Sequence, residues 1–259
     1  VDYQRSAELW FSKLGGEYRT ARARFAEGGL RLNPFSLEGE PRNLGFLAAW
    51  CAELVAAMPE DRPLIKQAIE ALYESGGARS LMHFAEILKS LSPELAARFA
   101  PYYAGGEKAG LFGSEEDALS IGDGWLAVDA TEAMGSAHEA VSLFAYLLHR
   151  LITALDGRPT IIVLQHAFPV LSQPFFAARL ESLLEMLKEN NAMVIFSMQV
   201  GESMAGHPLI ATLKQACGSL MVVPDDLTLP YAKILPDVFA PEDEMLSFSA
   251  HRLKNINNP

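Results

Sequence analysis

The sequence lacks a GxxxxGK[ST] phosphate loop anywhere in its 259 residues. Such a loop supplies the backbone N–H groups and the lysine that hold nucleotide phosphates, so this sequence alone does not build a complete phosphate site. It also lacks a GxSxG nucleophile elbow, and no Ser–His–acid order is convincing. An α/β hydrolase is therefore the weakest of the enzyme classes that its pattern suggests.

Cysteine is scarce, and long apolar runs are missing. Cys51 and Cys217 are the two cysteines, and no CxxC pair occurs, so neither a disulfide framework nor a cysteine metal site is indicated. Both lie in apolar surroundings, which predicts buried free thiols in a reducing cytoplasm. No apolar run approaches the ~18 residues of a membrane span, and residues 1–20 do not resemble a signal peptide. We expect a soluble chain and, because it begins with Val1, a fragment.

Positive charge is also in short supply. The chain has 21 Lys and Arg against 32 Asp and Glu, a formal net charge of −11. This balance argues against a wide surface that tracks nucleic-acid phosphates, so direct nucleic-acid binding is not indicated. His138 and Glu139 lie together near an expected helix start, but no third ligand stands at metal spacing. We expect no metal site formed by protein ligands.

What the sequence does contain is alternation of strands and helices. Half of the residues are hydrophobic, enough for one large α/β domain or a core domain with a helical insertion. Apolar runs of strand length alternate with amphipathic segments of helix length, an order typical of a parallel sheet. Because the runs are continuously apolar, we expect a sheet covered on both faces. The expected strands are 124–129, 159–164, 192–196 and 219–223, and the expected helices are 137–155, 174–189 and 210–216.

The segment 42–102 carries only helical signals. Apolar residues recur at helical spacing over 42–58 and 63–73, and helices are also expected at 80–91 and 92–102. We therefore expect an α-helical insertion subdomain at 42–102. It would lie between a first segment of the core, 1–41, and the rest of the core, 103–259. A helix at 6–14 and a short strand at 30–35, stopped by proline, belong to the first segment.

Polar residues follow two of the expected strands. Gln165 and His166 come directly after the apolar run 160–164, and Gln199 follows the run 192–196. A long amphipathic helix separates the two strands. This layout of strand, polar pair, helix and second strand makes these three residues the candidate site residues.

Five segments of the sequence are characteristic together. The stretch 143–164 consists of a helix, an Asp-Gly-Arg-Pro turn and an apolar strand, and the others are 1–18, LNPF at 32–35, GLFG at 110–113 and Ser-Met-Gln at 197–199. They resemble the C-terminal motor domain of the type IV secretion and conjugation ATPases (the VirB-four/TrbE/CagE group), and 143–164, the most similar stretch, resembles that family's Walker B segment. The resemblance implies a RecA-like three-layer parallel sheet with an α-helical insertion, and ATP and Mg as cofactors. It also implies a place in the energy module that powers pilus assembly and substrate transfer.

The same resemblance identifies positions at which this sequence differs from the family's motifs. Gln165 and His166 stand at the positions of the acidic Walker B pair, and Gln199 stands at the strand-end sensor position. An Asp there normally holds magnesium and a Glu activates the attacking water, and neither Gln nor His replaces them. We therefore expect this chain alone to be hydrolysis-deficient, with weak or absent nucleotide binding. The resemblance places it in the cytoplasm, associated peripherally with the bacterial inner membrane through the secretion complex.

Several alternatives remain open. Gln165 and His166 are either polar strand-end residues bonded to neighbouring loops, or a site repurposed for nucleotide or for a neighbouring subunit. Gln199 is either a relay to a subunit interface or a cap of the sheet edge. The chain as a whole is either a degenerate, structural subunit or a true ATPase whose phosphate loop lies upstream of Val1.

Partners follow from the same reasoning. Self-association, or contact with other type IV secretion subunits, is expected. In a RecA-like sheet the strand before the phosphate loop is central, and without it backbone groups would lack partners unless another segment fills the slot. We therefore also expect an adhesive sheet edge that promotes oligomers.

Overall fold

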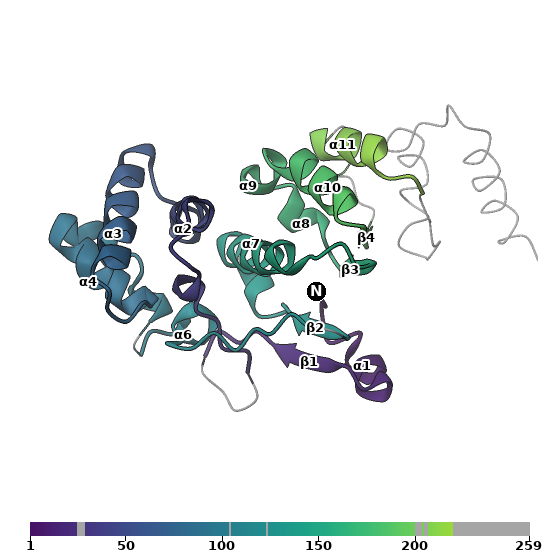
Figure 1. Cartoon of the computed structure of the whole chain (residues 1–259), viewed down its shortest axis with the longest axis horizontal. Helices are drawn as coiled ribbons and strands as arrows, with labels where there is room; N and C mark the ends of the chain where they lie inside the picture. Colours follow the sequence, from purple (N-terminus) through teal and green to yellow (C-terminus); the bar gives the residue numbers. More distant parts are fainter. Residues whose placement is uncertain (25–28, 104, 123, 200–203, 205–206, 220–259) are drawn as a thin grey trace, which may run out of the picture.

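The structure is a computed structural model, and it describes all residues except 25–28, 104, 123, 200–203, 205–206 and 220–259. It contains two small parallel sheets with helices packed beside them (Figure 1). In the first sheet β1 (Glu17–Thr20) pairs with β2 (Leu126–Asp129). In the second, β3 (Thr160–Leu164) pairs with β4 (Ala192–Phe196). The mixed helix and strand content confirms the α/β class, with parallel pairing as expected.

The first half of the chain is mostly helical. Helix α1 precedes β1, the other helices follow β1, and 3₁₀ turns (η) join several of them. The elements are α1 (Glu8–Leu14), η1 (Pro34–Ser36), α2 (Pro41–Leu54), η2 (Pro59–Asp61), α3 (Arg62–Glu74), α4 (Leu81–Leu91), α5 (Pro93–Ala97), η3 (Ala100–Tyr102) and α6 (Ala109–Phe112). The helices expected within 42–102 are thus confirmed, although the last is shorter and ends in a 3₁₀ turn.

The second half alternates helices with β2, β3 and β4. Its helical elements are η4 (Ala133–Gly135), α7 (Ala137–Ala154), α8 (Phe168–Leu171), α9 (Pro174–Ala177), α10 (Leu180–Glu189) and α11 (Pro208–Ala216). The strand expected at 219–223 lies outside the described residues apart from Ser219, which is not in a strand. Within the described residues, none of the helices is both long enough and apolar enough to span a bilayer.

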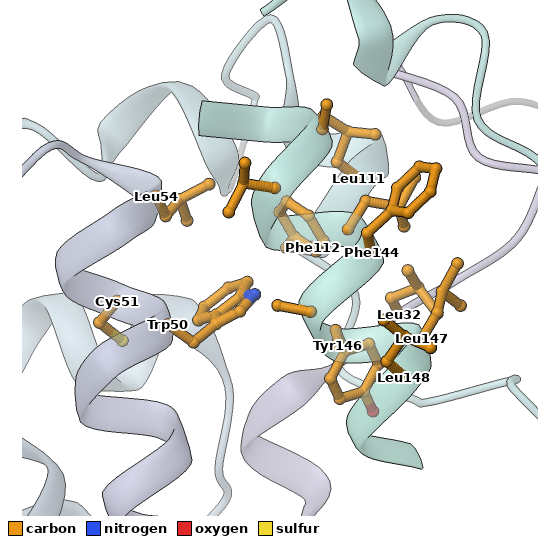
Figure 2. Close-up of a cluster of buried hydrophobic side chains, with 14 of the residues drawn as sticks. Leu32, Trp50, Cys51, Leu54, Leu111, Phe112, Phe144, Tyr146, Leu147 and Leu148 are labelled. Atoms are coloured by element: carbon orange, nitrogen blue, oxygen red, sulfur yellow. The ribbon is translucent and has the colours of Figure 1, made fainter. Parts of the chain in front are cut away.

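The main core lies between α2 and α7 (Figure 2). Trp50 is fully buried there, and its indole N–H donates to the Ser142 carbonyl oxygen at 2.9 Å. Its ring meets Phe112 edge-on, with the centroids 5.0 Å apart. Gly110 allows this arrangement, because a Cβ at this position would come within 2.3 Å of the Arg24 backbone. The segment 110–113 thus carries Phe112 into the core.

Two sequence predictions about local structure are wrong. The segment 30–35 is not a strand, because the Asn33 side chain accepts from the Phe35 N–H and starts a 3₁₀ turn. The helix expected at 174–189 is broken at Arg179. The Arg179 N–H donates to the Phe176 carbonyl oxygen, while the Phe175 carbonyl oxygen accepts from the Arg179 guanidinium instead.

Two predictions about burial are also wrong. Cys51 is buried as expected, but Cys217 is exposed because it follows α11, beyond the buried face of that helix. The second sheet is not covered on both faces within the described residues. Ile162 and Leu164 are buried beneath helices, whereas Ile161 and Met193, which pair across β3 and β4, are 66% and 53% exposed.

Candidate functional site

Residues Val1 and Asp2 lie between the two sheets (Figure 1). On one side, the Asp2 N–H donates to Val128 of β2, and the Asp2 carbonyl oxygen accepts from Ala130. On the other side, the Val1 nitrogen donates to Val163 of β3, and the Gln165 N–H donates to the Val1 carbonyl oxygen. The carboxyl ends of β1, β2 and β3 are thereby brought to one edge, joined through the first two residues.

A cluster of polar side chains occupies this edge, and we call it the carboxyl-edge cluster. Its members are Asp2, Tyr3, Ser6, Tyr18, Gln165 and His166. Asp2 is buried, and its carboxylate accepts from the Tyr18 hydroxyl at 2.5 Å and the Ser6 hydroxyl at 2.7 Å. Backbone N–H groups of Tyr3 and Ala7 also donate to it. Burial first, and then the bond to Asp2, raise the pKa of Tyr18 well above its ordinary value, so this phenol stays protonated and remains a donor.

Gln165 is tied to the start of the chain. Its side-chain oxygen accepts from the Tyr3 N–H at 3.2 Å and from the Ser6 hydroxyl at 2.9 Å. The Ser6 hydroxyl is therefore shared between the amide of Gln165 and the carboxylate of Asp2. A carbonyl oxygen has two lone pairs, so these two bonds use its accepting capacity.

His166 stacks on Tyr3, with the ring centroids 4.5 Å apart and the planes 11° from parallel. Its backbone has a φ of 51°. Histidine is among the non-glycine residues that adopt this left-handed conformation most often, and the turn directly after β3 requires it. The stacked ring covers the side of the turn that faces the first residues.

Gln199 is not part of this cluster. It is exposed, three positions after the end of β4, and no hydrogen bond among the described residues joins it to Gln165 or His166. Of the three candidate residues, the structure thus brings two together and leaves the third apart.

The sequence reasoning missed most of the cluster. Tyr18 lies in β1, whose sequence Glu-Tyr-Arg-Thr shows no apolar run, so the strand itself was not predicted. Asp129, which is buried, was missed as a site residue although it ends an apolar strand. Its carboxylate accepts from the Thr131 backbone and hydroxyl groups, and that hydroxyl in turn accepts from the Gln4 N–H. An acid at a strand end was the signal available for it.

The electrostatics of this edge favour cations over anions. The cluster contains one carboxylate and no Lys or Arg, and Asp129 adds a second buried carboxylate beside it. Arg5 is nearby in sequence, but it pairs with Glu8 on the surface. Within the described residues, no group of three or more His, Cys, Asp or Glu side chains is arranged to hold a metal ion.

The fold and this edge define the class of protein. It is an α/β domain with parallel strands whose polar residues gather at the carboxyl edge. By structure, the chain is similar to VirB4 of Thermoanaerobacter pseudethanolicus, with a TM-score of 0.73 at 14% identity over 93% of this chain and 72% of that one. This likeness shows a common fold.

Sequence comparison finds relatives among type IV secretion and conjugation proteins. The chain is 25% identical over 231 residues to the type IV secretion system protein virB4 of Bartonella henselae. It is 25% identical over 244 residues to PtlC of Bordetella pertussis, and 27% identical over 186 residues to the conjugal transfer protein TrbE of Rhizobium radiobacter. No protein-family model matches the chain. These relatives support membership of the VirB4/TrbE family of type IV secretion and conjugation proteins.

The matches cover most of this chain but a minor portion of each relative. They include 86% of the chain and 29% of the Bartonella and Bordetella proteins, and 70% of the chain and 22% of the Rhizobium protein. The chain thus spans less than a third of the length of these curated relatives.

Proposed function

We propose that this chain is a supporting, hydrolysis-deficient ATPase-type domain in the energy module of a type IV secretion or conjugation system. The observation that carries the proposal is the pair of hydrogen bonds that the Gln165 side chain accepts. At the position that the family resemblance assigns to a magnesium-binding Asp, a neutral amide holds the first residues in place through the Tyr3 N–H and the Ser6 hydroxyl.

The donor set at this edge does not fit Mg–ATP. A magnesium ion is usually bound through carboxylates and substrate phosphates, but the oxygen of Gln165 is uncharged and already accepts two hydrogen bonds. His166 is stacked on Tyr3 and lacks the carboxylate that would activate a water. The two buried carboxylates nearby, Asp2 and Asp129, would repel phosphate groups. No catalytic step through the nucleotide is therefore derived for this chain.

The same proposal includes the strand order of the whole sheet and the division of the chain into segments. The order β1, β2, residues 1–2, β3, β4 corresponds to a RecA-like parallel sheet in which the first two residues occupy the carboxyl end of the central position. The division into a first segment of the core (1–41), a helical insertion (42–102) and the rest of the core (103–259) goes with it.

The location and the partners follow from the family. The domain would act on the cytoplasmic side of the inner membrane, held to the secretion complex by other subunits or by self-association, and would support pilus assembly and substrate transfer. ATP and Mg would be bound by a catalytically active partner. This role needs no direct contact with nucleic acid.

Calorimetry with ATP and ADP, with and without magnesium, tests the proposal. The expected result is no binding at high micromolar concentration and no phosphate release above background. Magnesium-dependent binding with turnover would instead favour the second candidate, a true ATPase completed by residues outside this sequence.

A matched set of variants assigns any turnover to its site. Gln165→Ala/His166→Ala removes both side chains from the cluster, whereas Gln199→Ala removes an exposed side chain outside it. Turnover that disappears in the double variant and survives in Gln199→Ala would contradict the proposal directly.

A further inference from the structure

A groove of about 310 Å³ lies between α2, α7 and the α9–α10 segment, away from the carboxyl-edge cluster. Its floor is apolar, with Ala145, Leu148 and Phe176 all buried. Phe46, Phe175 and Leu183 form half-buried walls. The volume is at the lower end of small-molecule pockets, and it suits one or two inserted side chains better than a larger ligand.

His149 gives one wall of the groove a fixed, uncharged surface. Its ring stacks on Phe46 with the centroids 3.9 Å apart, and its Nε2 bonds to Asn43 Oδ1 at 2.8 Å. The Asn43 amide nitrogen donates to the Glu38 carbonyl oxygen, which leaves its oxygen to accept from the histidine. Burial first, and then the charges of Arg42 and Arg150, lower the pKa of His149 to about 4, so the ring is neutral at neutral pH.

Two arginines line this groove, Arg42 from α2 and Arg179 from the turn between α9 and α10. Arg179 lies over the Phe175 ring, 4.4 Å from its centroid, and donates to the Phe175 carbonyl oxygen. Arg42 is exposed, and its guanidinium approaches Met186 Sδ at 3.8 Å. Neither has a carboxylate partner among the described residues, and no acidic residue lines the groove. This is unusual in a chain with 32 acidic and 21 basic residues.

We propose that this groove docks a short segment of another protein subunit, in which an apolar side chain is flanked by carboxylates. The apolar side chain would cover the floor formed by Leu148 and Phe176. The carboxylates would pair with the guanidinium forks of Arg42 and Arg179, the geometry in which arginine binds carboxylate most strongly. The proposal is independent of nucleotide turnover, because no residue of the carboxyl-edge cluster lines the groove.

Gly45 offers a variant that closes the groove without disturbing the core. It lines the groove on α2, and a Cβ built there meets no atom within 4 Å. A side chain at this helical position also improves helix propensity. Gly45→Trp therefore fills the groove, and Gly45→Ala is the matched control that leaves it open.

The experiment is selection of random 12-residue peptides displayed on phage against the full chain, followed by fluorescence anisotropy with the enriched peptides. The expected peptides share a large apolar residue with Asp or Glu on both sides. Their affinity is expected to fall at least tenfold in Gly45→Trp and in Arg42→Glu/Arg179→Glu. It should be unchanged in Gly45→Ala and in Arg62→Glu/Lys89→Glu, which reverses two charges on exposed positions of α3 and α4.

Three results would overturn the proposal. They are no enrichment over blank beads, enriched peptides that lack acidic residues, and affinity that is equal in Gly45→Trp and Gly45→Ala. Arginine-dependent co-sedimentation with phosphatidylglycerol vesicles, in the absence of peptide enrichment, would assign the groove to lipid instead.

Discussion

The helical block α2–α5 and the β3–β4 sheet bury their apolar residues to different extents. The block is built around side chains with no exposed surface, among them Trp50, Phe84 and Phe99. In the sheet, every second residue of β3 and β4 is exposed, including Ile161 and Met193. The block is therefore packed on the face it presents to α7, while the sheet is packed on one face and open on the other.

An apolar sequence alone does not show whether both faces of a strand are covered. A continuous apolar run on a strand predicts two covered faces, and β3 has such a run. The helices α7, α8 and α10 cover one side, whereas on the other side Ile161 and Val163 are 66% and 40% exposed. The sheet thus keeps an apolar surface that another polypeptide can cover, while the helical block already has its own partner in α7.

The largest expected effect comes from breaking the packed region. Trp50→Ala removes a fully buried indole between α2 and α7, together with its hydrogen bond to the Ser142 carbonyl oxygen. A loss of about 3–5 kcal/mol in the free energy of unfolding is expected, measured by urea denaturation. Trp10 is 67% exposed, so Trp10→Ala is the control and should change stability by less than about 0.5 kcal/mol. Equal losses in the two variants would contradict the packing described for α2.

The next effect concerns the carboxyl-edge cluster, which lies where the first residues connect the two sheets. Gln165→Glu keeps the shape of the side chain but places a second carboxylate on the Ser6 hydroxyl that Asp2 already shares. Like charges at this separation destabilise the folded state, and we expect a loss of about 1–3 kcal/mol at neutral pH. The loss should shrink below about pH 5, where a carboxyl group becomes protonated.

Gln199→Glu is the matched control, because it adds the same charge at an exposed position after β4. Urea denaturation at pH 7 and pH 4.5 should show no comparable loss for it. If both variants lost stability equally, the cause would be the net negative charge of the chain and not the carboxyl-edge cluster.

The third effect depends on pH and concerns the contact between α2 and α7, where His149 bonds to Asn43. His149 has a folded-state pKa of about 4, below its ordinary value near 6.5, mainly because it is buried. Its contribution to stability is therefore fully present above about pH 6.5 and is lost as the pH falls towards 4. The loss is expected to reach up to about 3 kcal/mol.

His149→Gln keeps a donor for Asn43 but does not titrate. Its stability should fall less between pH 6.5 and pH 4 than that of the unaltered chain, as followed by denaturation at each pH. An equally steep loss of stability in His149→Gln and in the unaltered chain would contradict the assignment to His149.

Much of the fold could be predicted because its signals are local. Helical periodicity marked α2, α3 and α4, and the apolar run Ala192–Phe196 is β4 itself. What could not be predicted depends on contacts distant in sequence. β1 is a polar segment that becomes a strand by pairing with β2, more than 100 positions later. The break before α10 depends on a side chain that competes for a backbone carbonyl group.

Only two members of the carboxyl-edge cluster were identified from sequence, for the same reason. Gln165 and His166 were identified because they directly follow an apolar strand. Their partners Tyr3 and Ser6 lie about 160 positions away, and nothing near them in sequence indicates that they meet. The family resemblance supplied the positions of the acidic pair, but not the hydrogen bonds that now occupy Gln165. That the pair is degenerate stays a prediction until turnover is measured.

The smallest expected effect on stability concerns the exposed apolar face of β3 and β4. Ile161 is exposed on β3 opposite Met193 of β4, so Ile161→Lys loses little burial. The free energy of unfolding should change by less than about 0.5 kcal/mol. Self-association should nevertheless fall, because a charge at the centre of an apolar patch prevents another surface from covering it. Light scattering over a concentration series measures the change in mean mass.

Thr153→Lys adds the same charge at an exposed position in the last turn of α7, where a cation is compatible with the helix dipole. Its mean mass should match that of the unaltered chain. A chain that is monomeric at high concentration before any substitution would contradict the expected self-association. The apolar face of β3 and β4 would then be available to a different subunit, and addition of that subunit should protect the β3 and β4 amides from hydrogen exchange.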